Sequence, residues 1–227
     1  MRGWGSPPTV SWIDGTQVWL ITTGLVPESA LAQGRPWLDE NEVARAARFE
    51  RQSDRRLFEI AHVAARSIVA GALGCAPTEV VWGRAACPGC GGTHGRPNVA
   101  GGGVEFSLTH ARGLAAVALA PRPVGVDVEG VRAGVAKDVA SSLHPDERRE
   151  IESCDGPEVA FTRAWTRSEA YLKALGIGLG REPSLDYLGA GPEPKRTLDG
   201  FVVRDLPTAS GFIGAVATQL SGTQLPL

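Results

Sequence analysis

The most informative stretch of the chain reads Val124-Gly125-Val126-Asp127-Val128-Glu129. Side chains alternate between the two faces of a β-strand, so the three valines would lie on one face and the two carboxylates on the other. We therefore expect a strand that buries its valines and presents Asp127 and Glu129 side by side. A solvated strand edge is the simpler interpretation of such a pair, so the pair alone does not specify a site.

A second acidic stretch follows as Trp165-Thr166-Arg167-Ser168-Glu169-Ala170-Tyr171-Leu172-Lys173. Its pattern is helical, and residues four apart lie one above the other on a helix, so Glu169 and Lys173 share a line with Trp165. Glu169 could then join the two strand carboxylates. Clustered carboxylates suit Mg²⁺ or Mn²⁺ together with substrate phosphates. The alternative is a surface ion pair between Glu169 and Lys173.

The composition excludes several classes of protein. The 227 residues suffice for one large domain or two small ones, and 43% of them are apolar. A formal net charge of −2 gives no global field that would attract nucleic acid or an anionic membrane. We find no membrane-spanning run and no signal-peptide core, so we expect a cytoplasmic protein. Its four cysteines are then thiols or metal ligands rather than disulfides.

Hydrophobic periodicity predicts long helices in both parts of the chain. One runs from Asp39 to Leu73 with a break near residues 52–54, and it ends at Gly74, a residue type that favours helix C-termini. The other begins at Pro157 or Glu158 and ends at Gly176. The remaining expected elements are a short helix at 146–152, strands at 16–21, 79–82, 104–108, 114–119, 124–129, 201–203 and 212–218, and loops after residue 21 and at 83–103.

A weak internal repeat is also visible. Arg66-Ser67 precedes Gly74 much as Arg167-Ser168 precedes Gly176, and Gly113–Ala118 resembles Gly211–Ala217. If the repeat reflects duplication, each half would be a long helix packed on a small antiparallel sheet. Duplication and chance similarity both stay open at this point.

Three more motifs precede the two acidic stretches. They read Arg48-Phe49, Gly95-Arg96-Pro97 and Phe106-Ser107-Leu108-Thr109-His110. In this order, the five motifs resemble those of the 4′-phosphopantetheinyl transferases, specifically the surfactin-synthetase-activating (Sfp-like) type. The resemblance spans residues 45 to 180, and five motifs in register are far more specific than any one alone.

The resemblance implies a transferase. Such an enzyme moves the 4′-phosphopantetheine arm of coenzyme A, its co-substrate, onto a serine hydroxyl of an apo acyl or peptidyl carrier protein and releases adenosine 3′,5′-bisphosphate. By resemblance, Asp127, Glu129 and Glu169 would hold Mg²⁺ or Mn²⁺. Glu169 would also act as the base, and Lys173 would stabilise the leaving phosphate. The coenzyme A contacts that the resemblance implies are Arg48, Arg56, Arg96, Thr109, His110, Asp127 and Lys173.

One position departs from the family pattern. The family usually has a lysine immediately before the glutamate of the helix, and this chain has Ser168. Arg167 is adjacent, but it points about 100° away on a helix and is not an obvious replacement. The departure puts one phosphate contact in doubt and leaves the expected metal site unchanged.

The loop Cys87-Pro88-Gly89-Cys90-Gly91-Gly92-Thr93-His94 has the Cys-x₂-Cys spacing of a zinc knuckle. A fourth ligand is not evident, although Cys75 is a candidate. The favoured interpretation is a glycine-rich loop that positions Arg96 and leaves its thiols unused. Structural zinc at Cys87, Cys90 and His94 is the less favoured alternative.

Together these features predict an α+β protein of two similar, pseudo-symmetric halves, each a long helix packed on a small antiparallel sheet, with the active site in the crevice between them. Residues 1–120 would supply the arginines, the cysteine-rich loop and the Thr-His motif, and residues 121–227 the metal-binding strand and the Glu/Lys helix. We expect a monomer that acts on a carrier protein, with no nucleic-acid or membrane partner. The alternatives are a non-catalytic homologue that binds coenzyme A or a carrier protein, and a zinc-loop interaction protein.

Overall fold

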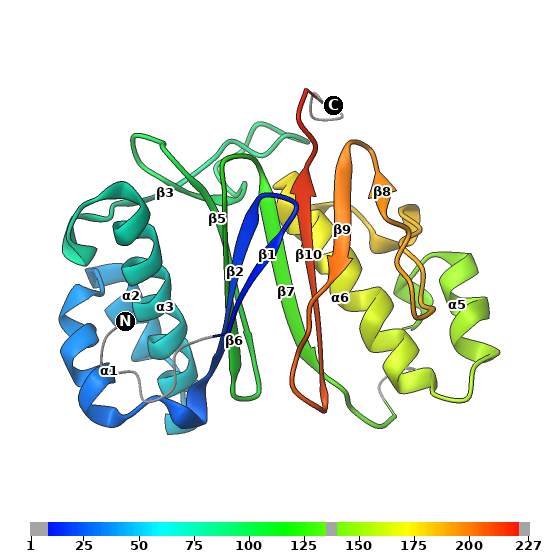
Figure 1. Ribbon diagram of the computed structural model, residues 1–227, viewed down its shortest axis with the longest axis horizontal. Coiled ribbons are helices and arrows are strands. Elements are labelled where there is room, and N and C mark those ends of the chain that lie inside the picture. The colour runs from blue at the N-terminus through cyan, green and yellow to red at the C-terminus, as the bar shows by residue number, and fades with distance from the viewer. Residues whose placement is uncertain (1–8, 135–139, 223–227) are drawn as a thin grey trace.

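The computed structural model describes residues 9–134 and 140–222 and contains two four-stranded antiparallel sheets with helices on both outer sides (Figure 1). The strands are β1 (Thr9–Ile13), β2 (Thr16–Thr22), β3 (Trp82–Arg84), β4 (Pro97–Val99), β5 (Glu105–Ala111), β6 (Leu114–Ala120), β7 (Val124–Gly130), β8 (Thr197–Leu198), β9 (Phe201–Asp205) and β10 (Phe212–Gln219). The α-helices are α1 (Glu28–Gly34), α2 (Glu40–Ala46), α3 (Gln52–Leu73), α5 (Pro145–Glu152) and α6 (Pro157–Leu175). Short 3-10 helices occupy Thr23–Leu25, Arg35–Trp37, Pro77–Glu79, Ala140–Ser142, Gly178–Gly180 and Pro183–Leu185.

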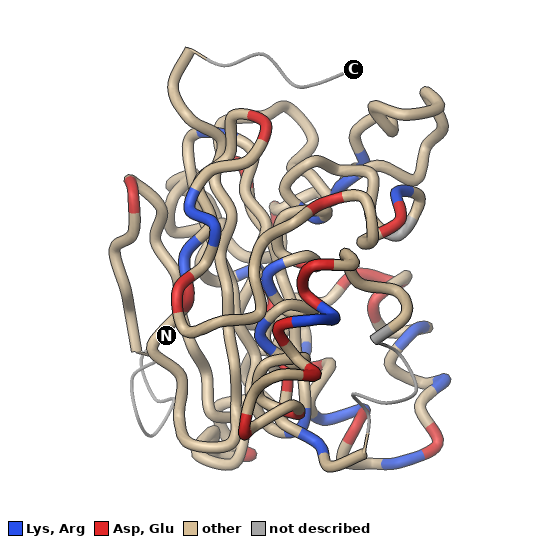
Figure 2. Tube along the Cα trace, turned by 90° about the vertical axis from the view of Figure 1, so that its right-hand side faces the viewer, with Lys and Arg blue, Asp and Glu red and all other residues tan. Residues whose placement is uncertain are grey.

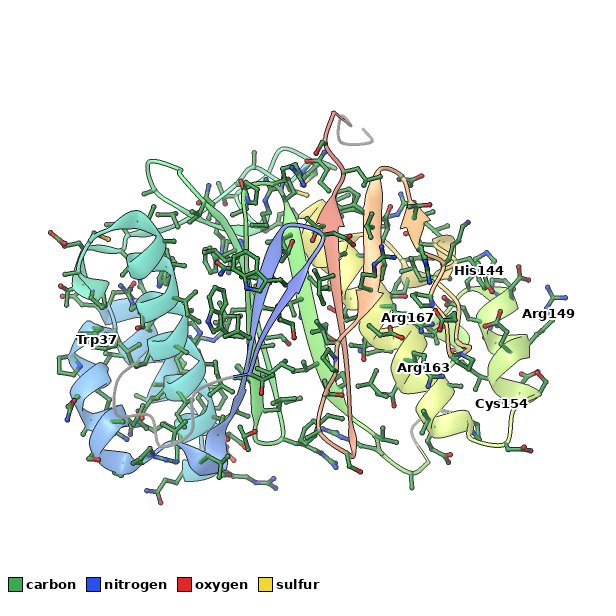
Figure 3. All side chains as sticks on the ribbon, viewed as in Figure 1. Trp37, His144, Arg149, Cys154, Arg163 and Arg167 are labelled. Atoms are coloured by element: carbon green, nitrogen blue, oxygen red, sulfur yellow. The ribbon has the colours of Figure 1, made fainter. Side chains whose placement is uncertain are left out.

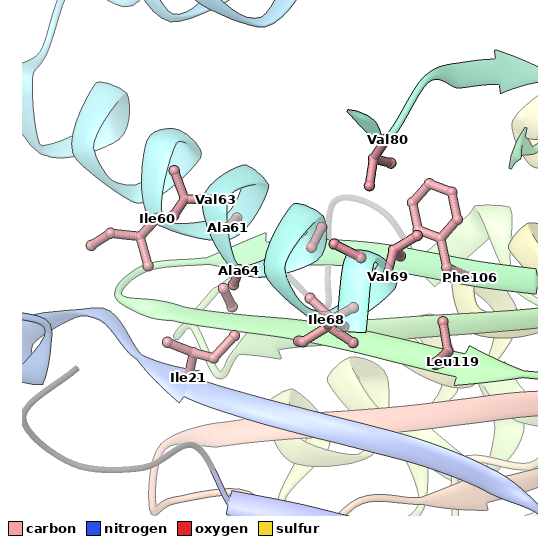
Figure 4. Close-up of a cluster of buried hydrophobic side chains, with 14 of the residues drawn as sticks. Ile21, Ile60, Ala61, Val63, Ala64, Ile68, Val69, Val80, Phe106 and Leu119 are labelled. Atoms are coloured by element: carbon pink, nitrogen blue, oxygen red, sulfur yellow. The ribbon is translucent and has the colours of Figure 1, made fainter. Parts of the chain in front are cut away.

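The first sheet has the order β1-β2-β6-β5 and is covered on one face by α3. Figure 4 shows the apolar side chains of α3, among them Ile60 and Ile68, packed against Ile21 and Leu119 of the sheet. Strand β6 is buried along its whole length because its second face contacts the other sheet. This double burial explains why β6 is a continuous apolar run rather than an alternating one.

The second sheet has the order β7-β10-β9-β8. Its inner face packs on the first sheet through the three valines of β7, at 124, 126 and 128, which lie in one cluster with Val18 and Leu20 of β2. Its outer face is covered by α6, which packs on Ala215 and Ala217 of β10. Because side chains alternate along a strand, the non-valine positions of β7 face α6.

Hydrogen bonds that involve hydroxyl side chains join the two sheets. Strands β5 and β7 form no backbone ladder with each other; instead, the backbone N–H of Val126 donates to Oγ of Ser107 at 3.0 Å. A second link joins the hydroxyl oxygens of Thr16 and Thr218 at 2.7 Å. Valine packing and hydrogen bonds of buried hydroxyl groups therefore hold the two sheets together.

Most of the predicted elements are confirmed, with shifted ends. The break near residue 52, both long helices with their C-terminal glycines, the short helix and the strands at 16–21, 104–108, 114–119, 124–129, 201–203 and 212–218 all occur. Gly74 and Gly176 have φ of 69° and 83°, the left-handed values that favour glycine.

Three local predictions are wrong. Helix α1 occupies part of the predicted loop after residue 21, and β1 pairs with β2 without having been predicted. The strand expected at 79–82 begins only at Trp82, because Pro77 opens a 3-10 turn. Part of the expected loop at 83–103 is ordered as the β3–β4 hairpin.

Two fully buried arginines connect α3 and α6 to neighbouring segments through hydrogen bonds. Arg66 of α3 donates to Glu42 at 2.6 Å, to Asp39 at 2.7 Å and to the backbone carbonyl of Val80 at 2.8 Å. Arg167 of α6, which Figure 3 shows between α6 and the neighbouring segments, donates to both carboxylate oxygens of Asp205, at 2.8 and 2.6 Å. Protein groups accept hydrogen bonds from both guanidinium groups, so both arginines stabilise the packing of the long helices.

Charged residues of both signs are interleaved along the chain (Figure 2), in keeping with the small net charge. No helix within residues 9–134 and 140–222 is long and apolar enough to cross a bilayer.

A buried glutamate anchors the segment that follows α6. Glu147 of α5 has no exposed surface, and one of its carboxylate oxygens accepts hydrogen bonds from the backbone N–H groups of Leu188 at 2.8 Å and Gly189 at 2.9 Å. Burial raises the pKa of Glu147 to about 7, although these hydrogen bonds oppose the rise. Ionisation of this residue therefore costs stability.

We predict that the free energy of unfolding falls as the pH rises through the pKa of Glu147. Because the folded-state pKa of about 7 exceeds the ordinary 4.5, the folded protein holds this proton more tightly than the unfolded chain does. The associated stabilisation is complete below the ordinary pKa of 4.5. It is lost as the pH rises through the folded-state pKa of about 7. The loss should be roughly 2–4 kcal/mol. Urea unfolding across this range should show the loss in the wild type and not in Glu147→Gln.

The exposed Glu152 on the same helix provides the control, because Glu152→Gln should retain the wild-type pH dependence. A wild-type profile parallel to that of Glu147→Gln would contradict the prediction.

Candidate active site

Strand β7 directs Asp127 away from its valine face and toward α6. The carboxylate is 3% exposed, and its Oδ1 accepts hydrogen bonds from Oγ1 of Thr109 at 2.9 Å and from Nζ of Lys173 at 2.6 Å. Thr109 belongs to β5 and Lys173 to α6. Oδ2 of Asp127 is buried and has no hydrogen-bond partner among the described residues. One carboxylate thus joins the two sheets and α6, and keeps one oxygen for another ligand.

Gly125 determines how close α6 lies to this strand. A Cβ atom at position 125 would stand 2.0 Å from the carbonyl oxygen of Ala170 and 2.5 Å from the backbone nitrogen of Ala174. Both of these atoms belong to the backbone and cannot rotate away. The absence of a side chain at Gly125 therefore lets α6 bring Lys173 into contact with Asp127.

Two more carboxylates flank this contact. Glu129 lies two residues after Asp127 on β7, and Glu169 lies one helical turn before Lys173 on α6; both are partly buried. Burial raises the pKa of Glu129, and the charge of Asp127 raises it further. Burial likewise raises the pKa of Glu169, against the opposing effect of Lys173. Although Arg132 and Lys173 oppose the rise at Glu129, burial and the charge of Asp127 still raise its pKa, and an additional cation would stabilise these carboxylates.

The donor atoms of this group fit a hard divalent cation such as Mg²⁺. Oδ2 of Asp127 is a buried oxygen without a donor, which is costly unless a cation or another donor meets it. In the described part of the chain, the carboxylates of Asp127, Glu129 and Glu169 do not form a group whose ligand atoms all lie within 4.8 Å of one another. Water or substrate oxygens would therefore complete the coordination, as is usual for Mg²⁺.

Lys173 also lines a cavity of about 210 Å³, together with Arg84, His94 and Arg96. Arg96 is mostly buried, and its Nε donates to Glu105 at 2.9 Å. The rest of its guanidinium lies near Gly176, at the end of α6. Three cationic side chains around one cavity suit a ligand that carries phosphate groups.

A second cavity, of about 410 Å³, shares Arg84, Pro97, Phe106 and Leu108 with the first, and His110 lines it. Burial lowers the pKa of His110, and the charges of His62, Arg45 and Lys173 lower it further. The imidazole is therefore neutral at physiological pH and can still donate one N–H to an anion. The other lining residues are Arg45, Phe58, His62, Ala65, Trp82, Gly83, Arg84, Pro97, Phe106, Leu108 and Thr109.

The predicted helical arginines are separated in space. Arg48 is exposed and, with Arg45, lines a third cavity of about 540 Å³. Arg56 instead pairs with Glu28 and donates to the carbonyl oxygen of Val26. Arg56 does not line any of the three cavities described above. The side chain of Arg56 therefore connects α3 to α1 and to the segment before it.

Sequence reasoning missed several cavity residues. Arg45 lines two of the cavities, and its position one turn before Arg48 on a helix was the available signal. His62 and Trp82 line the 410 Å³ cavity because both contact Glu42, at 2.6 and 2.9 Å respectively. No sequence pattern indicates that contact, since Glu42 is distant from both residues in the chain.

Ser168 occupies the position where the family pattern has lysine. It is 1% exposed, and its Oγ has no hydrogen-bond partner among the described residues. The neighbouring Arg167 is committed to Asp205 and to backbone carbonyls. Neither side chain provides a cation at the cavities.

The cysteine loop brings its three candidate ligands together. One ligand atom from each of Cys87, Cys90 and His94 lies within 4.8 Å of the other two, and they are the only such group among the described residues. Sγ of Cys90 stands 2.9 Å from Nε2 of His94. Cys75 is a free cysteine outside this group.

Comparison with known proteins points to one superfamily. Residues 123–200 match the family model of the 4′-phosphopantetheinyl transferase superfamily. This segment contains Asp127, Glu129, Glu169 and Lys173.

Curated relatives extend the match along the chain. The 4′-phosphopantetheinyl transferase HetI of Nostoc sp. is 28% identical over 96% of this chain and 94% of its own length. The L-aminoadipate-semialdehyde dehydrogenase-phosphopantetheinyl transferase of Schizosaccharomyces pombe is 28% identical over 64% of this chain and 62% of its own. The holo-[acyl-carrier-protein] synthase of Thermotoga maritima is a solved structure with 21% identity and a TM-score of 0.37, covering 43% of this chain and 62% of its own. By the matched segment and the curated relatives, this chain is similar to proteins of the 4′-phosphopantetheinyl transferase superfamily.

We predict that Gly125→Ala destabilises the protein by about 1–3 kcal/mol or more, because the new methyl group must push the backbone of α6 away from β7. Urea unfolding measures the change. Gly71→Ala on α3 is the matched control, since a Cβ atom there meets nothing within 4 Å. That change should be neutral or stabilising, because alanine favours a helix by about 1 kcal/mol over glycine. Equal stability of the two variants would show that the close approach at Gly125 is unimportant.

Proposed function

We propose that this protein transfers the 4′-phosphopantetheine arm of coenzyme A to a serine hydroxyl of an apo acyl or peptidyl carrier protein, with Mg²⁺ or Mn²⁺, as an enzyme of the surfactin-synthetase-activating type. The observation that carries the proposal is the buried Asp127. It accepts hydrogen bonds from Thr109 and Lys173, keeps Oδ2 without a partner, and lies in the segment that matches the superfamily model.

The reaction requires neutralisation of charge and a proton acceptor. The serine oxygen attacks the phosphorus atom next to the pantetheine arm, and the bond from that phosphorus to the bridging oxygen breaks. Adenosine 3′,5′-bisphosphate leaves with the electron pair. A divalent ion at Asp127, Glu129 and Glu169 would supply Lewis-acid stabilisation of the pyrophosphate charge. The Lys173 ammonium would add a second positive charge where the leaving phosphate develops.

Glu169 is the residue that we assign as the base, acting directly or through water. It is half-buried on α6, and it has no hydrogen bond to another described residue that would occupy its carboxylate. Its raised pKa makes it a better proton acceptor than an ordinary exposed glutamate. The proton of the serine hydroxyl would pass to this carboxylate.

The cavities supply contacts for the rest of coenzyme A. Arg96 lies beside Lys173, where a pyrophosphate would meet both cations. Neutral His110 and Arg45 line the 410 Å³ cavity, and Arg48 lines the 540 Å³ cavity, so they are candidates for the remaining phosphate. Thr109 acts by orienting Asp127. The role first assigned to Arg56 is the weakest of the set, because Glu28 occupies its guanidinium.

We also infer that residues 1–120 and 121–227 are two similar halves with the site in the crevice between them. The order strand, long helix and hairpin describes both β2–α3–β5–β6 and β7–α6–β9–β10. In each half the last strand pairs antiparallel with the first. The presence of one fully buried arginine on each long helix, Arg66 and Arg167, adds support.

The non-catalytic alternative is disfavoured. Ser168 was its only support, and that residue is buried in α6, whereas Asp127, Glu129, Glu169 and Lys173 are all present. A monomer in the cytoplasm that recognises a carrier protein remains our expectation.

The proposed transfer predicts a covalent change in a carrier protein. Incubation of the protein with coenzyme A, Mg²⁺ and a panel of apo-carriers from fatty-acid, polyketide and non-ribosomal peptide systems should add one phosphopantetheine arm to at least one carrier. Intact-mass spectrometry measures the gain. The gain should disappear with a chelator and with a carrier whose acceptor serine is changed to alanine. A folded protein that modifies no carrier would refute the proposal.

The assignment of Asp127 and Glu169 predicts loss of turnover without loss of the fold. Asp127→Asn keeps an oxygen that accepts from Thr109 but removes the charge, and it should slow turnover by about 10²-fold or more. Glu169→Gln removes the base and should slow turnover by about 10²–10⁴-fold. Initial rates on a modified carrier and thermal unfolding are measured together.

The control for both variants is Asp186→Asn. Asp186 is also 3% exposed and pairs with Arg181 at 2.6 Å, but it lines none of the cavities described above. This variant should lose stability and retain turnover. If Asp127→Asn or Glu169→Gln turns over like the control, the assignment of that residue is wrong.

A further inference from the structure

The loop between β3 and β4 is folded around two sulfur atoms and an imidazole. The N–H of Cys87 donates to the carbonyl of Gly92 at 2.7 Å, and the N–H of Gly91 donates to the carbonyl of Cys87 at 2.8 Å. These bonds close a tight turn, within which Gly91 has a φ of 72°. The turn brings Cys90 beside His94, with Sγ and Nε2 2.9 Å apart.

A backbone N–H group is directed at one of the sulfur atoms, because that of Gly92 donates to Sγ of Cys90 at 3.4 Å. Such donors stabilise thiolates, the form in which cysteine binds metals. A Cβ atom at Gly92 would lie 3.3 Å from both Sγ of Cys90 and Nε2 of His94, so a side chain there would crowd the two ligand atoms.

The distances suit a tetrahedral ion. Zinc binds sulfur at about 2.3 Å and imidazole nitrogen at about 2.0–2.1 Å, which places the ligand atoms of a tetrahedral site about 3.5–3.8 Å apart. The ligand atoms of Cys87, Cys90 and His94 lie within 4.8 Å of one another, and Sγ of Cys90 stands 2.9 Å from Nε2 of His94. Small side-chain rotations would bring all three to bonding distance.

We propose that Cys87, Cys90 and His94 bind one zinc ion, with the fourth position open to water or another exogenous ligand. Two thiolates and one imidazole select zinc over Mg²⁺, which prefers oxygen ligands. Cys87 is buried, whereas Cys90 and His94 are exposed, so an ion can enter from solvent. The structure thereby favours zinc binding by this loop, which was the less favoured interpretation of the sequence alone.

The zinc ion positions Arg96. His94 is two residues before Arg96 in the chain, and both line the 210 Å³ cavity with Lys173. The base of the loop is already tied, because the N–H of Ala85 donates to the carbonyl of Arg96 at 3.0 Å. Zinc would fix the tip of the loop and reduce the freedom of Arg96. This consequence for coenzyme A rests on the proposed function, whereas zinc binding does not.

The first test measures metal in the full chain. Protein purified under a reductant and without chelator, then supplied with zinc and desalted, should contain about one zinc ion per chain by elemental analysis. Cobalt in place of zinc should give thiolate-to-cobalt charge-transfer absorption. Zinc affinity should fall by about 10²-fold or more in Cys90→Ser and in the double variant Cys90→Ser/His94→Ala.

The matched control is Cys154→Ser. Cys154 is an exposed free cysteine in the segment between α5 and α6, remote from the β3–β4 hairpin (Figures 1 and 3). This variant should retain the zinc. Hydrogen exchange at the backbone N–H groups of residues 85–96 should be slower with zinc than without it, in the wild type and in the control.

Three results would overturn the proposal: no zinc in the reduced wild type, equal zinc in the double variant, or unchanged hydrogen exchange in the loop. None of these measurements depends on carrier modification. A failure of the zinc proposal can therefore be distinguished from a failure of the proposed transferase activity. A raised KM for coenzyme A with little change in kcat in Cys90→Ser would then report the effect on Arg96.

Discussion

Helix α6 and strand β7 approach each other so closely at Gly125 that a single Cβ atom there would overlap the helix backbone. This approach allows Lys173 to reach Asp127 across the interface at 2.6 Å. The same strand face carries Glu129, and the same helix carries Glu169. The arrangement of charges at the candidate site therefore depends on the absence of one side chain.

Asp127 is also hydrogen-bonded both to the first sheet and to α6. Its carboxylate is almost fully buried, and a buried charge is tolerated only when it is paired and hydrogen-bonded. Thr109 supplies a hydroxyl from the first sheet, and Lys173 supplies an ammonium from α6. The other oxygen of Asp127, Oδ2, has no hydrogen-bond partner in the part of the chain that the structure describes. This unsatisfied acceptor is the feature that a divalent cation would relieve, and it is the reason that we place the chemistry here.

Arginine residues in this fold serve two different purposes. Arg66 and Arg167 are fully buried, and carboxylates and backbone carbonyls satisfy them, so they hold helices in place. Arg45 and Arg48 line cavities and are exposed. Arg96 is intermediate, because one of its nitrogens pairs with Glu105 while the side chain still lines a cavity. Burial and partner choice distinguish the structural arginines from those available to a phosphate.

The sequence by itself determined what depends on near neighbours in the chain. The alternation at Val124–Glu129 predicted a strand with two faces, and the glycines at 74 and 176 predicted where the long helices end. The spacing of Cys87, Cys90 and His94 identified candidate ligands, because residues that close in sequence can be brought together by one turn. The order of five motifs indicated a type of 4′-phosphopantetheinyl transferase, and residues 123–200 match the model of that superfamily.

Only the tertiary structure decided which distant groups meet. Arg56 was a candidate phosphate ligand by sequence, but packing places Glu28 against it, whereas Arg45 lies at two cavities. Cys75 remained a candidate zinc ligand until the structure placed it outside the cluster. Local periodicity and turn preferences are encoded within a short window of sequence. The partner of a long charged side chain depends instead on how separate elements pack, and no short stretch of this chain carries that information.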